Sequence, residues 1–525
     1  MRAPLAVGLG ILLSRIAGLV RERVLAHYLG NSDAAGAFRA ALRIPNLLQN
    51  LFGEGVLSAS FIPVYARLLE EGKEKDAARV AGITFTLLAL GVGVLAALGA
   101  WASEPLIALL APGFSGDVRD VTVRMVRVMF PGTGLLVLSA WCLGILNSHR
   151  KFFLSYVAPV AWNVSMIALL VAVGARCTGT REGQMELGVL LAWSTVAGAA
   201  LQLAVQLPSA LSLNGGLRPG LSSAFAPMRT VTRNFVPALM SRGVVQLSAY
   251  VDQILASFLG AGVVSALAYA QTIYLLPVSL FGMSISSSEL PEMARTTGSP
   301  EEKAKALQAR LTKALRRLTF FIAPSAVAMM LLGDAVAGTL LQTGRFQESD
   351  SALVWLLLAG SALGLAATTK SRLCVSLFWA LHDSKTPARY AFYRVALSAG
   401  LGWLIVFPAR EALDLDPAWC AAGLAAAGGL AGWIEYALVR RALRRKVGEI
   451  DGGASSGAVL WIAAGLAAAA GWAIKATLPP LYPAVRGLLI LGTYGAAYLA
   501  LATLAGNAEA REFVSDAASR LRKKT

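Results

Sequence analysis

Long apolar runs separated by short polar segments make up almost the whole chain. Runs of about 20 or more mostly apolar residues are typical of helices that cross a bilayer. We predict an all-α polytopic membrane protein with 14 transmembrane helices. Their expected ranges are 4–29, 36–68, 78–102, 119–147, 152–175, 185–212, 229–259, 263–292, 311–333, 350–380, 387–408, 417–441, 456–478 and 484–506.

The polar segments between these runs alternate in charge. Lys and Arg are frequent in one set, as at 73–79, 150–151 and 440–446, and scarce in the intervening set, as at 260–263 and 478–483. Because Lys and Arg concentrate in cytoplasmic loops, the basic set is predicted to be cytoplasmic. An even number of spans then places both termini in the cytoplasm.

An internal repeat divides the spans into two groups. The motif FGEG at 52–55 is followed by PVYAR at 63–67, and FG at 281–282 is followed by PEMAR at 291–295. The two copies lie in spans of the same direction, which predicts two parallel six-helix halves, as in some transporters. The last two spans fall outside the duplication and form an appended pair.

Four regions follow from this organisation. They are a first six-helix lobe at 1–215, a second at 216–446, the appended pair at 447–508 and a basic tail at 509–525. In the second lobe, Ser299, Pro300 and Glu302 have the order of a capping box and predict a helix at the cytoplasmic surface over 299–318. Its basic residues, like the tail, are expected to meet lipid headgroups.

Composition narrows the class further. Of 525 residues, 56% are hydrophobic and only 15% charged, with a mean hydropathy of +0.62. A soluble protein carries about a quarter charged residues, so no room remains for a sizeable soluble domain. The net charge of +17 is assigned to cytoplasmic loops, and no nucleic-acid recognition module is visible.

Several kinds of chemistry are not expected. The four cysteines are scattered without a CxxC spacing, so neither disulfides nor a thiolate metal site is predicted. GLAATTKS at 364–371 lacks the second glycine of a Walker A motif and lies inside an apolar run. The first apolar run lacks a small-residue cleavage site, and we expect it to be a retained span.

Arginines inside predicted spans are the main functional signal. A charge at bilayer depth costs at least about 2.5–3.5 kcal/mol, so such residues normally face a polar cavity. Arginine binds phosphate groups bidentately and stays charged, which indicates an anionic cargo. The arginines concerned are Arg15, Arg21, Arg39, Arg43, Arg242 and Arg372. For Arg39, snorkelling to the membrane surface is an equal alternative.

Polar residues near these arginines extend the candidate site. Arg39, Arg43, Asn46, Asn50 and Glu54 recur at spacings of three to four residues, so they share one helix face. Glu22 lies beside Arg21 and is expected either to form a structural ion pair or to contact the cargo. Glu54 is a further partner for Arg15 or Arg21.

Two acidic residues are candidate ligands of a monovalent coupling cation. Asp252 lies in the span at 229–259, and Asp383 precedes the span at 387–408. The alternative for Asp383 is a helix-start signal before Lys-Thr-Pro.

Several motifs resemble the MurJ family. They are SRIAGLVRE at 14–22, IPNLL at 44–48, FGEG at 52–55, GILNS at 144–148 and DSKTP at 383–387. The resemblance covers essentially the whole chain. It implies a flippase fold of the MOP superfamily with 14 helices in two lobes. It also implies export of lipid II, the undecaprenyl-diphosphate precursor of peptidoglycan, and a groove for the polyprenyl tail on the appended pair.

The resemblance also assigns cavity residues. Arg15, Arg21, Glu22, Glu54 and Arg372 match basic or acidic positions of the family site. At three other family positions, two of them arginines and one acidic, this chain has Gln49, Thr272 and Gly36. The full expected substrate-binding set is Arg15, Arg21, Glu22, Arg39, Arg43, Asn50, Glu54, Arg242 and Arg372. In it, Arg39 or Arg242 replaces the missing charge.

The expected function is a flippase for lipid II, and not an enzyme. It would work by alternating access without a bound cofactor, as a monomer in the bacterial inner membrane, driven by the membrane potential or a Na⁺ or H⁺ gradient. An alternative is a flippase for another undecaprenyl-diphosphate glycan. A scaffold in envelope assembly is a third class, but a scaffold has no need of cavity arginines.

Overall fold

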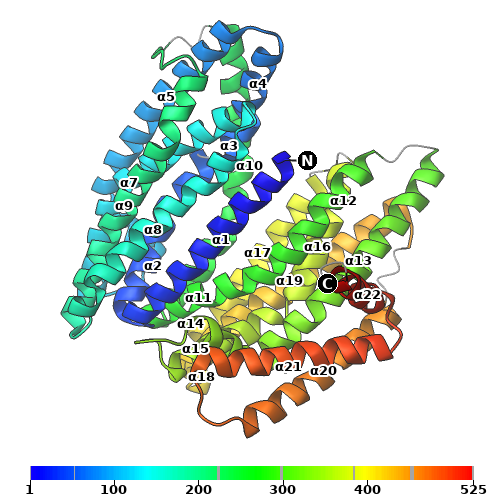
Figure 1. The fold of residues 1–525 in the computed structure, drawn as a ribbon. Coiled ribbons are helices and arrows are strands. Elements are labelled where there is room, and N and C mark those ends of the chain that lie inside the picture. Colours follow the sequence, from blue (N-terminus) through cyan, green and yellow to red (C-terminus); the bar gives the residue numbers. More distant parts are fainter. Residues whose placement is uncertain are drawn as a thin grey trace. The chain divides into compact units, whose positions relative to one another are not determined.

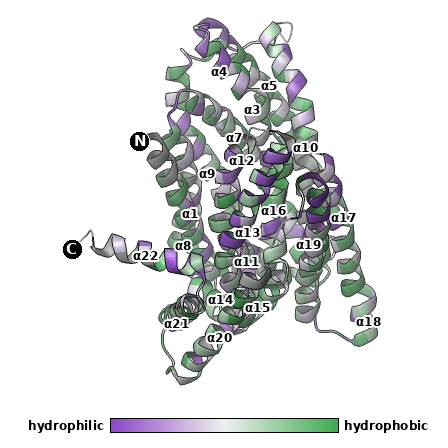
Figure 2. Cartoon of the chain, turned by 90° about the vertical axis from the view of Figure 1, so that its right-hand side faces the viewer, coloured by the Kyte–Doolittle hydropathy of each residue, from purple (hydrophilic) through white to green (hydrophobic). Residues whose placement is uncertain are grey.

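The computed structural model describes residues 2–52, 54–221, 225–295, 299–381, 383, 385–449 and 454–522. Within these ranges the chain is almost entirely helical and has no strand. Ten helices there are long and apolar enough to cross a membrane, or up to 11 if one bent pair is a single span. Figure 2 shows hydrophobic residues along most of their length. The all-α, multi-span class is confirmed, whereas the number of 14 spans stays a prediction.

The chain forms two compact units, Met1–Ser265 and Ala266–Thr525. The helices of the first unit are α1 (Arg2–Leu29), α2 (Asp33–Phe52), α3 (Glu54–Ser60), α4 (Ile62–Glu70), α5 (Glu74–Trp101), α6 (Ser103–Leu110), α7 (Gly116–Ser148), α8 (Phe152–Cys177), α9 (Arg181–Leu213), α10 (Ala226–Ser257) and the start of α11 (Ala261–Pro277). Helix α7 packs against α2, α5 and α9, while α8 packs between α1 and α9 (Figure 1).

The first unit extends beyond the predicted lobe boundary at residue 215 because α10 belongs to it. Helix α10 packs on α2 and α3. The hydroxyl of Tyr250 in α10 donates a hydrogen bond to the carbonyl oxygen of Arg43 in α2, at 3.1 Å. By packing, the seventh predicted span therefore joins the first six.

Polar contacts between buried helices add to close packing in the first unit. Ser139 of α7 donates to Gln206 of α9 at 2.6 Å and accepts from Gln202 at 2.9 Å. The indole of Trp141 is fully buried and donates to the carbonyl of Ala81 in α5 at 3.0 Å. Lipid is as apolar as leucine, so helix association in a membrane depends on such packing and hydrogen bonds.

The predicted span at 36–68 is not a single helix. It consists of α2, α3 and α4 in succession, and α4 has Pro63 in its first turn. A proline there is tolerated because the first turn of a helix has no internal acceptor for its N–H groups. Pro45, in contrast, lies inside α2 without ending it.

The second unit starts within α11. Its further elements are η1, a π-helix (Val278–Met283), α12 (Ser284–Ala294), α13 (Pro300–Leu331), α14 (Gly333–Leu341), α15 (Glu348–Ala362), α16 (Leu365–Ala380), α17 (Lys385–Leu404), η2, a second π-helix (Ile405–Ala409), α18 (Arg410–Leu413), α19 (Pro417–Val447), α20 (Ala454–Thr477), α21 (Pro483–Leu504) and α22 (Ala508–Arg522). Helix α19 packs against α15, α16 and α17, and the α20–α21 pair packs on α13 and α14.

The predicted surface helix at 299–318 and the span at 311–333 form one helix, α13. The capping box is confirmed, since Ser299 Oγ accepts from the Glu302 amide at 3.3 Å and Glu302 accepts from the Ser299 amide at 2.9 Å. No turn residue follows the basic stretch, so the helix continues to Leu331. The start of the predicted helix is confirmed, its end at 318 is not, and its place at the cytoplasmic surface stays a prediction.

The predicted span at 350–380 is bent. Helices α15 and α16 meet at 46°, next to Gly364. A Cβ atom on Gly364 would lie 2.3 Å from Cα of Gly429 in α19, so this close approach requires glycine. Lys370 and Ser371 lie inside α16, not at the start of a phosphate-binding helix.

The internal repeat is visible in the local structure of both units. In each, a long helix is followed by a short one, α6 or α14, then by a loop and a further helix, α7 or α15. The loops carry Phe114 and Phe346, which are both buried. The Phe281-Gly282 motif of the second copy lies in the π-helix η1. The matching Phe52 of the first copy is the last residue of α2.

Candidate functional site

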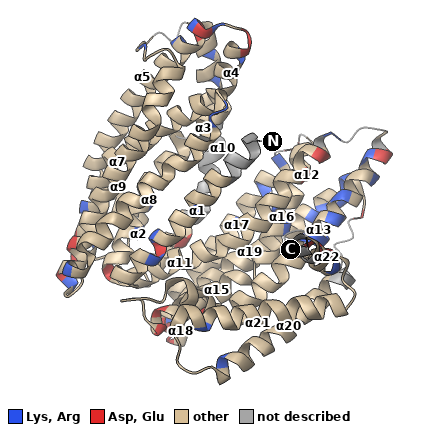
Figure 3. Ribbon diagram, in the orientation of Figure 1, with Lys and Arg blue, Asp and Glu red and all other residues tan. Residues whose placement is uncertain are grey.

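A buried ion cluster lies at the contact of α1, α2 and α8. Glu22 of α1 is 2% exposed and lies between two arginines. Arg21 donates to Glu22 at 2.5 Å. Arg39 of α2, 8% exposed, donates to one carboxylate oxygen at 3.1 Å and forms an ion pair with the other. Figure 3 shows that Lys, Arg, Asp and Glu are few along the helices, which are otherwise mostly uncharged.

Helix α8 fixes the orientation of Arg21. The Asn163 side-chain amide donates to the carbonyl of Pro159 at 3.0 Å, which leaves its oxygen to accept from Arg21 at 3.0 Å. The guanidinium also lies over the ring of Trp162, 5.1 Å from its centroid. A stacked and hydrogen-bonded guanidinium is preorganised for planar anions. Arg21 remains 17% exposed.

This cluster decides between two interpretations made from the sequence. Arg39 does not snorkel, because its guanidinium is held by Glu22 inside the first unit. Glu22 forms the structural ion pair that was one of its two alternatives. With two arginines and one carboxylate, the cluster keeps a net positive charge.

The other predicted residues of the first unit lie apart from this cluster or outside the described side chains. Arg15 of α1 and Asn50 of α2 are exposed. Arg43 is half-buried and interacts electrostatically with Asp252 of α10. Glu54 and Arg242 lie in α3 and α10, but their side chains fall outside the described part of the structure.

The second unit has a membrane-span ion pair that the sequence analysis missed. Arg394 of α17 forms an ion pair with Glu435 of α19, with 3.1 Å between Nε and a carboxylate oxygen, and their side chains are 31% and 12% exposed. Arg372 of α16, which was predicted, is exposed and acts electrostatically on Glu435. Both residues could have been predicted from the sequence, because each is a charged residue inside a predicted span.

Asp383 starts a helix. Its carboxylate accepts from the amide and the hydroxyl of Thr386 at 3.1 and 2.9 Å, and Lys446 of α19 donates to it at 2.7 Å. The Lys446 hydrogen bond, with those from Thr386, lowers the pKa of Asp383 to about 2. The helix-start interpretation is confirmed, and a coupling cation at Asp383 would have to compete with Lys446.

The described ranges give no further support for a metal site. No group of three or more His, Cys, Asp or Glu side chains there is arranged to hold a metal ion. Asp252 and Asp383 belong to different units, so a cation at these residues stays a prediction.

One of the departures from the family pattern, Gly36, has a local explanation. A Cβ atom on Gly36 would lie 2.1 Å from the carbonyl oxygen of Ala261, so no side chain fits where α2 meets the start of α11. Thr272 donates its hydroxyl to the carbonyl of Ala268 in its own helix at 3.0 Å. Gln49 is half-buried, and nothing in the structure explains it.

A family model described as lipid II flippase MurJ matches residues 25–492. The chain belongs to this family. A probable lipid II flippase MurJ of Rhizobium tropici is 33% identical over 444 residues, which cover 82% of this chain and 78% of the relative. The lipid II flippase MurJ of Burkholderia cenocepacia is 31% identical over 398 residues, covering 74% and 75%.

Solved structures agree on the fold. A lipid II flippase MurJ in an inward closed conformation superposes with a TM-score of 0.77 at 22% identity, over 95% of this chain and 98% of that one. An inward-facing multidrug transporter of the MATE family, from the MOP superfamily, gives 0.63 at 15% identity over 85% and 99%. The predicted family and MOP-type fold are confirmed, and the chain is a multi-pass membrane protein.

Proposed function

We propose that this protein moves lipid II from the cytoplasmic to the periplasmic leaflet of the bacterial inner membrane. The observation that carries the proposal is the family match over residues 25–492. The relatives named above give no support to another undecaprenyl-diphosphate glycan as cargo. Gly36 is explained by packing against Ala261, so its departure from the family pattern does not indicate a different cargo.

Each unit, taken by itself, has an arginine that we propose as a contact for an anionic headgroup. In the first, Arg21 is oriented by Asn163 and Trp162 and keeps an exposed side. In the second, the exposed Arg372 has this role. Guanidinium groups bind diphosphate oxygens bidentately and stay charged, so they hold the headgroup throughout the cycle. Arg15, Arg43, Asn50, Glu54 and Arg242 complete the proposed set.

Glu22 and Arg39 position the cargo-binding arginine. Their ion pair fixes the side of α1 that carries Arg21, while the second arginine keeps the cluster cationic. This differs from direct cargo binding by Arg39, because its guanidinium is already occupied by a buried carboxylate.

The proposed energy source is the membrane potential, with or without a Na⁺ or H⁺ gradient. Moving one elementary charge is worth about 2.3 kcal/mol per 100 mV. With the inside negative, outward movement of an anionic headgroup is downhill, and so is inward reset of an empty arginine cluster. The protein is thus proposed as a transporter without a cofactor, with both termini cytoplasmic and active as a monomer.

The outer surface of the appended pair is the proposed contact for the polyprenyl tail. Helices α20 and α21 expose apolar side chains, among them Ile462, Leu466 and Leu488. A long isoprenoid needs an apolar surface that continues into the membrane.

Complementation tests the proposal. In a strain depleted of its own lipid II flippase, the intact chain should restore growth and periplasmic exposure of lipid II. Failure of a membrane-inserted protein to do so would reject the function. Arg21→Ala combined with Arg242→Ala should abolish rescue, and full rescue by that variant would reject the site while leaving the function intact.

A further inference from the structure

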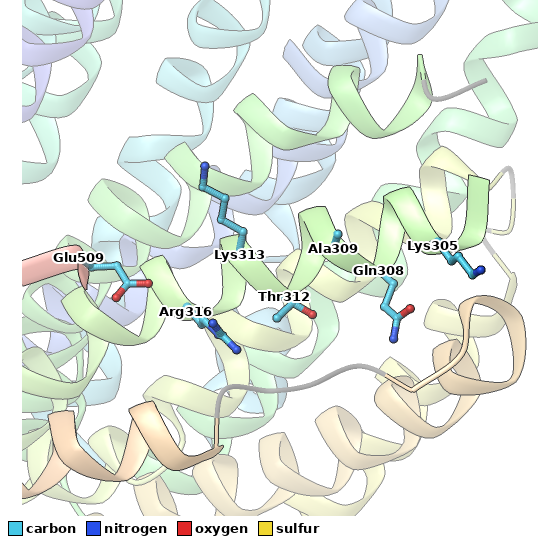
Figure 4. Close-up of a pocket in the computed structure, with 7 residues that line it drawn as sticks. All are labelled: Lys305, Gln308, Ala309, Thr312, Lys313, Arg316 and Glu509. Carbon is cyan, nitrogen blue, oxygen red and sulfur yellow. The ribbon is translucent and has the colours of Figure 1, made fainter. Parts of the chain in front are cut away.

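A basic pocket separate from the ion clusters lies between α13 and the start of α22. Its volume is about 450 Å³, within the range of small-ligand sites. It is lined by Lys305, Gln308, Ala309, Thr312, Lys313, Arg316 and Glu509. Figure 4 shows Arg316 and Glu509 toward one end, Lys305 at the other, and Gln308 and Thr312 between them.

The spacing of residues along α13 creates this pocket. The lining positions from 305 to 316 recur at intervals of three and four residues, so they share one face of the helix. On the other face, Leu307, Leu311 and Leu315 are fully buried in the second unit. The first half of α13 is therefore amphipathic, and its polar face forms the wall of the pocket.

The length of α13 places the pocket at headgroup depth. The helix has 32 residues, whereas about 20 cross the hydrocarbon core. Its charged residues end at Arg317, and the sequence is mostly apolar from Leu318 to Leu331. About 20 residues counted back from Leu331 reach Thr312, so the turn from Lys305 to Ala309 extends beyond the hydrocarbon, and Thr312 to Arg316 lie in the turn at its edge.

Helix α22 is held at the same level. Phe513 lies 6.1 Å from Phe320 and 6.2 Å from Phe321, measured between ring centroids. Ala510 is fully buried, whereas Phe513 and Val514 remain 45% and 42% exposed. An amphipathic helix anchored in this way lies in the membrane interface and leaves apolar surface beside the pocket for acyl chains.

The charge of the lining selects for an anion. The lining contains three basic side chains, Lys305, Lys313 and Arg316, and one carboxylate, that of Glu509. Neither Lys305 nor Lys313 forms an ion pair with a carboxylate of the described residues. Arginine and lysine are the usual partners of phosphate, and clusters of them beside a membrane attract anionic lipid.

We propose that this pocket binds the phosphodiester headgroup of an anionic phospholipid, whose acyl chains lie along the exposed apolar side of α22. Arg316 contacts the phosphate and Thr312 donates a hydrogen bond to it, while Lys305, at the other end of the pocket, adds to the positive field that attracts the headgroup. Glu509 limits the affinity by repelling the anion. The site is independent of the proposed cargo site and does not rest on the flippase activity.

Native mass spectrometry of the full-length protein in detergent, with phosphatidylglycerol as the probe, tests this site. Lys305→Gln with Arg316→Gln should weaken binding about 10- to 30-fold, from the contribution of each cation near an anionic lipid. Glu509→Gln should strengthen it. The matched controls are Lys303→Gln with Arg317→Gln on the same helix and Glu512→Gln on α22, none of which lines the pocket. The controls should leave binding unchanged.

Two results would overturn the proposal. Equal losses in the pocket and control pairs would mean diffuse attraction and no site. Displacement of phosphatidylglycerol by millimolar inorganic phosphate, with equal binding of phosphate alone, would identify a soluble ligand instead. Phosphatidylcholine should bind equally to all variants, which reports intact folding.

Discussion

Each unit contains an ion pair between a glutamate and arginine inside membrane-spanning helices, and the two differ in burial. In the first unit Glu22 is 2% exposed and is held by two arginines. In the second, Glu435 is 12% exposed and is held by one arginine, Arg394, which is itself 31% exposed. Burial therefore makes the first cluster a fixed part of the fold, while the second remains accessible to solvent and to other charges.

The consequence of this difference is energetic. A buried ion pair gains little over an apolar replacement, but removing one partner leaves the other charge buried without compensation. An exposed pair loses little, because water replaces the missing partner. The same substitution in the two units should therefore have unequal effects.

The largest expected effect is that of Glu22→Gln. The substitution leaves Arg21 and Arg39 without their carboxylate, and the free energy of unfolding should fall by about 3–5 kcal/mol. Reversible unfolding of the purified protein in mixed micelles measures this value. Glu71→Gln, at an exposed ion pair with Lys73, is the control and should leave the free energy of unfolding nearly unchanged. Equal effects at both sites would refute the role of burial.

Glu435→Gln should have an intermediate effect. Because Arg394 is partly exposed, we expect a loss of about 1–2 kcal/mol in the same unfolding measurement. Arg394→Gln should cost a similar amount, and the double variant should cost less than the sum, since both remove one interaction. Additive losses would mean that the two residues do not act as a pair.

Gly36→Ala tests the packing that holds the first cluster. Gly36 lies one helical turn before Arg39 on α2, and a methyl group there would collide with the carbonyl of Ala261. The collision should displace α2, lower the free energy of unfolding by about 1–3 kcal/mol and loosen the contact of Arg39 with Glu22. Gly18→Ala on α1 is the control, because nothing lies within 4 Å of its added Cβ atom. An equal loss at Gly18 would show that helix glycines are sensitive for another reason.

The sequence predicts the local parts of these sites better than their pairings. Arg21 and Glu22 are neighbours on one helix, and the turn of Asp383 depends on residues only three positions apart, so both were predicted. The pairing of Arg39 with Glu22 depends on the register of α1 against α2. That of Arg394 with Glu435 depends on how α17 packs on α19.

The same limit applies to the fold. Apolar periodicity predicts the helical spans because each depends on its own residues. It does not show that α2, α3 and α4 divide one apolar run, since apolar residues continue through the breaks. The continuation of α13 past its basic half was missed for the converse reason, because a change in polarity was taken as a change of element.

The smallest expected effect extends the comparison to a third carboxylate, outside the spans. Asp383 is 19% exposed and pairs with Lys446, which is 42% exposed, so the pair should contribute at most about 1 kcal/mol. Its pKa is lowered from 3.8 to about 2. A lowered carboxylate pKa adds stability above the unfolded value, so the contribution should be complete above about pH 4 and be lost as the pH falls towards 2. Unfolding at pH 6 and pH 3 should show this difference in the intact protein and lose it in Asp383→Asn. If the variant keeps the same pH dependence, other carboxylates dominate, and the order set by burial no longer extends beyond the membrane.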